Sequence, residues 1–117
     1  MNIEDFRTYC LSKKGTTEEL PFGPDTLVIK VCGKLFALFP IDEFNRVNLK
    51  CDPELALTLR ESFEAVISGY HMNKKHWNTV KIDGSIPDEL LFSWVDHSYE
   101  LVVNSLPKKV QAALQDR

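Results

Sequence analysis

The residues that could take part in chemistry concentrate in one stretch, residues 69–80, which reads GYHMNKKHWNTV. It contains two histidines, two lysines, two asparagines and two aromatic residues. Lysine attracts phosphate, asparagine can hydrogen-bond to the edge of a base, and an exposed tryptophan can stack on a base. The stretch therefore predicts a binding surface, and nucleic acid is one partner that suits its chemistry.

Two strands are expected to position this surface. Residues 46–51 and 77–82 alternate between apolar and polar side chains, which is typical of strands with one buried face. If helices cover the apolar face, the other face is basic and includes Trp77, and Lys74 and Lys75 lie at its edge. The candidate nucleic-acid-binding residues are Arg46, Asn48, Lys50, Asn73, Lys74, Lys75, His76, Trp77, Asn78 and Lys81.

In an alternative interpretation the same surface binds a partner other than nucleic acid. Tyr70, His71 and Trp77 would then anchor a protein or line a pocket for a small ligand, with no nucleic-acid role, because interfaces favour aromatic anchors. In a third interpretation Trp77 packs against Tyr70 and the charges form an ordinary solvated face. The formal net charge of −3 counts against DNA binding, because committed DNA-binding proteins usually carry a basic excess.

No catalytic, metal or cofactor constellation is expected. His71 and His76 have no third ligand near them in the sequence, whereas zinc sites use three or four protein ligands. Asp96, His97 and Ser98 are adjacent on a predicted helix, so their side chains point in different directions and cannot form a triad by themselves. We therefore expect a binding protein rather than an enzyme.

Length and composition indicate one domain over residues 1–117, of ordinary apolar content. The three cysteines, Cys10, Cys32 and Cys51, form no CxxC pair and suit a reducing compartment. No apolar run is long enough to span a bilayer, and the acidic start does not match a secretory signal. We expect a cytoplasmic monomer with no membrane association.

The first half of the chain predicts a helix capped by Asn2, a loop over 16–25, a hairpin of strands 27–31 and 35–39, and a strand over 46–51. The second half predicts a helix starting at Asp52-Pro53 and a strand over 77–82. A long helix opened by a Ser85–Asp88 capping box and a short helix over 108–114 complete the prediction. Links between the early strands are too short for parallel crossovers. The prediction is a two-layer α+β domain whose mainly antiparallel four-stranded sheet carries its helices on one face.

Four segments together resemble the MmcQ/YjbR family of small bacterial proteins: PFGPDTLV at 21–28, NLKCDPE at 48–54, GYHMNKKHWNTV at 69–80 and DHSY at 96–99. The resemblance covers nearly the whole chain. It implies a frataxin-like (CyaY-like) domain, which has been likened to a double-wing DNA-binding domain, and with it a DNA-binding, regulatory role. The family's signature positions carry no established chemical role; here they are Tyr70, His71, Asn73, Lys74, His76, Trp77 and Asn78.

The frataxin likeness also raises iron binding by an acidic ridge. The region of the first helix offers few acids for such a ridge, namely Glu4, Asp5, Glu18 and Glu19. Iron binding is therefore a third and less favoured hypothesis.

Overall fold

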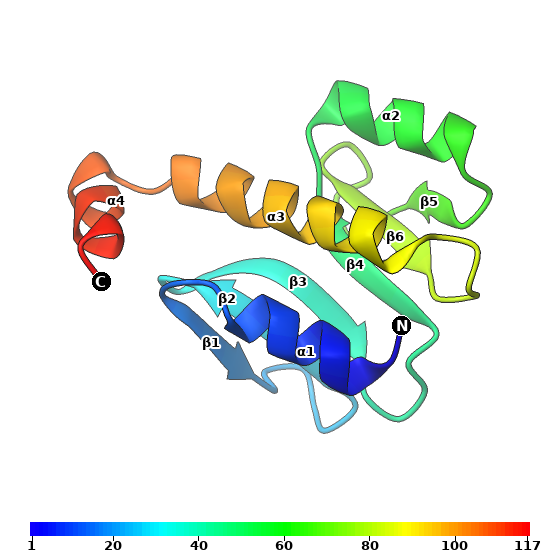
Figure 1. Ribbon diagram of the computed structural model, residues 1–117, viewed down its shortest axis with the longest axis horizontal. Coiled ribbons are helices and arrows are strands. Elements are labelled where there is room, and N and C mark those ends of the chain that lie inside the picture. Colours follow the sequence, from blue (N-terminus) through cyan, green and yellow to red (C-terminus); the bar gives the residue numbers. More distant parts are fainter.

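A computed structural model describes residues 1–117 and shows two layers, a twisted antiparallel sheet and helices packed on one of its faces (Figure 1). The strands, in the order β1-β2-β3-β4-β6-β5 across the sheet, are β1 (Thr16–Glu19), β2 (Thr26–Val31), β3 (Lys34–Pro40), β4 (Arg46–Lys50), β5 (Val66–Ser68) and β6 (Trp77–Lys81). The helices are α1 (Ile3–Leu11), α2 (Pro53–Ser62), α3 (Asp88–Asn104) and α4 (Lys108–Gln115). The α+β class and the antiparallel pairing are as predicted. No helix is long and apolar enough to cross a bilayer.

The sheet has six strands rather than the predicted four. β1 lies in the predicted loop and pairs with β2 at the sheet edge, and β5 pairs with β6 at the opposite edge. β1 is almost wholly polar and exposed, and β5 has three residues, so neither carries a long apolar alternation in the sequence. Pairing with a longer neighbour makes each of them a strand, which local sequence does not reveal.

Helix starts follow the predicted caps at two of three places. The side chains of Asn2 and Asp52 accept hydrogen bonds from the backbone of α1 and α2, respectively. The predicted capping box of α3 is wrong, since Pro87 occupies the N-cap position without a side-chain hydrogen bond. Ser85 instead donates its backbone N–H to Asp83 Oδ1, at 2.9 Å, and so closes a turn before the helix.

The core lies between α1, α3 and the sheet. Phe6 of α1 packs edge-on against Phe39 of β3, with ring centroids 5.2 Å apart. Four apolar side chains of α3, Leu91, Trp94, Val95 and Val102, are buried in the same cluster. The predicted hairpin between β2 and β3 is confirmed, and its two turn residues, Cys32 and Gly33, have φ of 48° and 84°. Positive φ at both positions is the geometry of a tight hairpin turn.

The hydroxyl of Ser98 on α3 completes the sheet where β3 and β4 diverge. Direct pairing between these strands is restricted to Ala37 with Leu49 and Leu38 with Asn48. Ser98 Oγ then donates to the carbonyl oxygen of Phe36, at 2.5 Å, and accepts from the backbone N–H of Lys50, at 2.9 Å. Since Ser98 is fully buried, this hydroxyl satisfies the buried carbonyl group of Phe36 and the partly buried N–H group of Lys50, which no neighbouring strand pairs with.

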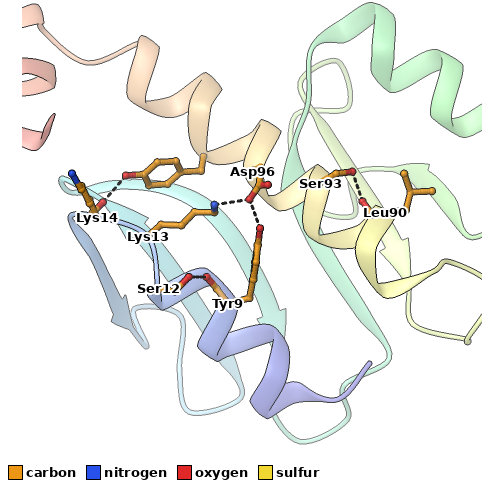
Figure 2. Close-up of polar contacts among 8 residues, drawn as sticks. Tyr9, Ser12, Lys13, Lys14, Leu90, Ser93 and Asp96 are labelled. Atoms are coloured by element: carbon orange, nitrogen blue, oxygen red, sulfur yellow. Dashed lines mark hydrogen bonds and ion pairs between the residues drawn. The ribbon is translucent and has the colours of Figure 1, made fainter.

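The neighbours of Ser98 on α3 also make tertiary contacts. Asp96 accepts a hydrogen bond from Tyr9 Oη at 2.7 Å and forms an ion pair with Lys13 Nζ at 2.5 Å (Figure 2). His97 Nε2 accepts from the backbone N–H of Asp52, and Tyr99 Oη donates to the carbonyl oxygen of Lys14. The Asp96–Tyr99 segment therefore ties α3 to α1, to the sheet and to the start of α2.

The Tyr9–Asp96 hydrogen bond predicts a loss of stability in alkali. It is the main reason that the pKa of Tyr9 is raised from 10.0 to about 12. Because the folded pKa exceeds the unfolded one, this contribution is fully present below pH 10 and is lost as the pH rises toward 12. The free energy of unfolding, measured with urea across this pH range, should decline less for Tyr9→Phe than for the parent. An identical decline in both would contradict the assignment, since Tyr99, whose pKa is also raised, remains in each.

Candidate ligand-binding groove on the outer sheet face

The face of the sheet that the helices leave uncovered, here called the outer face, carries the side chains that the strand alternation indicates. Register pairs Arg46 with Lys81, Asn48 with Thr79, and Lys50 with Trp77. Paired residues project to the same side of a sheet, so all six share one face. Leu49, one residue along β4, projects into the core on the helix side.

Two of the candidate nucleic-acid-binding residues on this face are not available to a ligand. Trp77 is 9% exposed and Asn48 is 5% exposed. The backbone N–H of Tyr70, in the loop after β5, donates to Thr79 Oγ1 at 2.8 Å, and Thr79 Oγ1 donates to Asn48 Oδ1. The expected stacking by Trp77 and hydrogen bonding to a base by Asn48 are therefore wrong for this conformation.

Asn78 projects to the helix side and is also buried. It is 3% exposed and lies opposite Leu49 in the register. Arg60 of α2 donates Nε–H to Asn78 Oδ1 at 2.7 Å, and the Asn78 amide nitrogen donates to the carbonyl oxygen of Ala56 at 3.5 Å. Asn78 thus joins α2 to β6 and cannot read a base, which corrects the prediction.

Arg60 also holds the loop between β5 and β6. Its Nη2 donates to the carbonyl oxygen of Lys74 and, at 3.2 Å, to that of Trp77. Sequence reasoning missed this residue, because an arginine on a helix normally indicates a solvated position. The three carbonyl or amide oxygens that it binds come from one short segment, so its planar donor group fixes that segment against α2.

The remaining loop residues divide between structure and surface. Asn73 Oδ1 accepts from the backbone N–H groups of Lys75 and His76, at 2.9 and 3.3 Å, and so shapes the turn. His76 is half-buried, whereas Lys74 and Lys75 are exposed. Lys75 lines a shallow hollow of about 170 Å³ together with residues of α2, namely Pro53, Glu54, Leu57 and Arg60. It therefore lies toward the helix side, and the ten candidates do not form one continuous surface.

A groove of about 480 Å³ opens on the outer face at the opposite end of β4 and β6 from Lys50 and Trp77. Its lining residues are Asn45, Arg46, Ile67, Tyr70, Thr79, Lys81, Ile82 and Asp83. The volume is in the range of sites for small molecules. The structure thus joins Arg46 and Lys81 from the first set of candidates to Tyr70 from the alternative set.

Tyr70 forms one wall of the groove. Its side chain is 53% exposed, and the guanidinium carbon of Arg46 lies 5.5 Å from the centre of its ring. The His71 ring centroid lies 4.1 Å from that of Tyr70, and His71 has a positive φ of 58°. A non-glycine residue rarely adopts this conformation, so the loop is held in an unusual shape at the rim of the groove.

The two cationic side chains of the groove, Arg46 and Lys81, form no ion pair with an acidic residue. Neither Arg46 nor Lys81 takes part in any of the ion pairs, which join Met1 to Asp88, Arg7 to Glu18, Lys13 to Asp96 and Lys30 to Glu19. The nearby carboxylate of Asp83 accepts hydrogen bonds from Ser85. These bonds, with a smaller effect from the charge of Lys81, lower the pKa of Asp83 below its ordinary value.

No cysteine lines this groove, and Cys10 and Cys51 are poorly suited to act as nucleophiles. Burial raises the pKa of Cys10 to about 12 and that of Cys51 to about 11, and all three thiols are unpaired. Nucleophilic cysteines need the thiolate form near neutral pH, which is the opposite shift. The groove itself presents the cations Arg46 and Lys81, the aromatic ring of Tyr70 and the apolar side chains of Ile67 and Ile82.

These features define a class, a small α+β domain with a basic, aromatic-walled groove on the open face of its antiparallel sheet. Comparison with known proteins then identifies the family. The chain belongs to the YjbR family, whose model matches residues 11–101. The resemblance to MmcQ/YjbR proteins is thereby confirmed.

Relatives match over most of their lengths. The Escherichia coli (strain K12) protein YjbR, described as uncharacterized, is 37% identical over 97% of this chain and 98% of its own. The E. coli O157:H7 protein YbdF, also described as uncharacterized, is 39% identical over 78% of this chain and 75% of its own. The crystal structure of the Deinococcus radiodurans protein DR2400, a DUF419 domain, superposes with a TM-score of 0.92 at 36% identity, covering 97% of this chain and 88% of that one.

Proposed function

We propose that this protein is a binding module whose functional site is the outer-face groove, and that it binds a small ligand there rather than catalysing a reaction. The observation that supports this most is the joining of Arg46, Lys81 and Tyr70 around one hollow of about 480 Å³. An exposed aromatic wall beside unpaired cations is a typical arrangement for recognition. A cytoplasmic, monomeric protein with reduced cysteines accords with this proposal.

A fragment screen observed by amide NMR tests the proposal. Binding compounds should shift the resonances of Ile67, Tyr70, Thr79 and Lys81 in a saturable way. Tyr70→Ala should weaken the binding of these compounds about tenfold, because it removes the aromatic anchor. Phe22→Ala is the matched control, since Phe22 is an exposed aromatic on another loop and its loss should change nothing. Hits that shift other regions, or hits unaffected by Tyr70→Ala, would contradict the proposal.

DNA binding is a second candidate function, supported by the exposure of Lys74 and Lys75 and by the absence of acid partners for Arg46, Lys50 and Lys81. Since Asn48, Trp77 and Asn78 are buried, such binding would use phosphate contacts and would not depend on base sequence.

Lys74→Ala/Lys75→Ala should then weaken binding of labelled duplex DNA at low salt and reduce the slope of log affinity against log salt by about 1.8. Fluorescence anisotropy across a salt series measures both quantities. Lys108→Ala/Lys109→Ala removes the same charge from two exposed lysines of α4 and is the control. Equal losses in the two double variants, or no binding at low salt, would reject a DNA role for this loop.

A further inference from the structure

The two cationic residues of the groove occupy directly opposed positions on neighbouring strands. Arg46 of β4 and Lys81 of β6 are register partners, and directly opposed side chains in an antiparallel pair have Cβ atoms about 5 Å apart. Like charges in this position repel and destabilise the pair. The other polar contact of Arg46 is with Asn45 Oδ1, at 3.1 Å, which is a neutral acceptor. The pair therefore lacks an anion between its members.

The rest of the lining indicates what such an anion would be attached to. Ile67, on the neighbouring strand β5, is 40% exposed and lines the same hollow with Ile82 and Tyr70. An isoleucine on a sheet face gains free energy when an apolar group covers it. The hydroxyl of Thr79 already donates to Asn48 and accepts from the Tyr70 backbone, so its proton is not available to a ligand.

Asp83 limits the charge of the ligand. It lines the groove, and its lowered pKa keeps it ionised at neutral pH. A second anionic group placed beside this carboxylate would be repelled, whereas a hydroxyl or amine could donate to it. The lining therefore suits a molecule with one anionic group and an apolar body.

We propose that the ligand of the groove is a small organic anion whose single carboxylate or phosphate bridges Arg46 and Lys81 and whose apolar body covers Ile67 beside Tyr70. This inference rests on the proposed function, since it names the ligand class of the same groove. The anion relieves the repulsion between the opposed cations, and the apolar body distinguishes the ligand from inorganic phosphate.

Four probes test the ligand class by amide NMR: phenyl phosphate, benzoate, inorganic phosphate and the neutral benzyl alcohol. Phenyl phosphate and benzoate should give saturable shifts at Arg46, Ile67, Tyr70 and Lys81. Inorganic phosphate and benzyl alcohol should bind about tenfold more weakly or not at all, because the first lacks the apolar body and the second lacks the anionic group. Comparison of phenyl phosphate with benzoate distinguishes a phosphate ligand from a carboxylate one.

Arg46→Gln and Lys81→Gln should each abolish the response to phenyl phosphate, whereas Lys34→Gln, at the exposed β2–β3 turn, should leave it unchanged. Without ligand, Lys81→Gln should melt at the same or a higher temperature than the parent, because it removes a like-charge contact. Phenyl phosphate should then raise the melting temperature of the parent and not that of Lys81→Gln.

The outcomes separate this inference from the proposed function. If benzyl alcohol saturates the groove as well as phenyl phosphate does, or if binding persists in Arg46→Gln, the anionic ligand is overturned and the groove remains a binding site. If none of the four probes shifts the groove, the inference is overturned, and the fragment screen alone decides whether the groove binds anything.

Discussion

Replacing Ser98 by alanine is expected to lower the free energy of unfolding by about 3 kcal/mol. The hydroxyl is fully buried, donates to the carbonyl oxygen of Phe36 and accepts from the backbone N–H of Lys50. Alanine would leave the buried carbonyl group of Phe36 and the partly buried N–H group of Lys50 without this partner, and each unsatisfied buried group costs about 1–3 kcal/mol. Chemical denaturation of parent and variant measures the difference.

Ser93→Ala provides the matched control on the same helix. Its hydroxyl also donates to a backbone carbonyl oxygen, that of Leu90, but the residue is exposed, so water replaces the lost bond (Figure 2). The expected change is within about 0.5 kcal/mol. Equal effects at the two serines would show that Ser98 does not stabilise the junction of β3 and β4 beyond an ordinary helical position.

Replacing Arg60 by alanine is the second large expected effect, a loss of about 2–3 kcal/mol. The variant removes donors from Asn78 Oδ1, which is buried, and from the carbonyl oxygens of Lys74 and Trp77. It should also release the β5–β6 loop, so amide hydrogen exchange should accelerate around residues 74–78 more than in the core. Arg60→Lys should rescue little, since a single ammonium cannot reproduce the planar set of donors.

Arg7→Ala is the control for Arg60. Arg7 forms a two-point contact with Glu18, but both side chains are substantially exposed, and surface ion pairs contribute about 0–1 kcal/mol. An Arg60 variant that is no less stable than the Arg7 variant, with unchanged exchange at 74–78, would show that the loop holds its shape without α2.

The most distinctive segment of the sequence, residues 69–80, largely stabilises the fold. Within 69–80, Asn73 shapes a turn, Asn78 binds Arg60, and Thr79 joins Tyr70 to Asn48. Gly69 is required for close approach, since a Cβ there would lie 2.8 Å from that of Trp77. Much of the pattern that suggested a binding surface therefore builds the loop between β5 and β6, and the exposed remainder includes Tyr70, His71, Lys74 and Lys75.

Local sequence determined the elements whose signals are complete within a few residues. The cap at Asn2, the glycine turn of the hairpin at Gly33, and the alternation in β4 each depend on neighbours in the chain, and each was predicted. The same alternation correctly assigned Arg46, Lys81 and Trp77 to one face, because side chains on a strand repeat every two residues.

Tertiary structure alone decided which of those side chains a ligand can reach. The two-residue repeat of the strands places Trp77 and Asn48 on the outer face, but both are buried in the folded chain. The edge strands β1 and β5 form because longer strands pair with them, and Arg60 acquires its role because α2 packs against β6. These are contacts between residues distant in sequence, and their free energies depend on a geometry that no local pattern contains. The groove of Arg46, Tyr70 and Lys81 has the same origin, since it joins two strands and a loop that meet only in the folded chain.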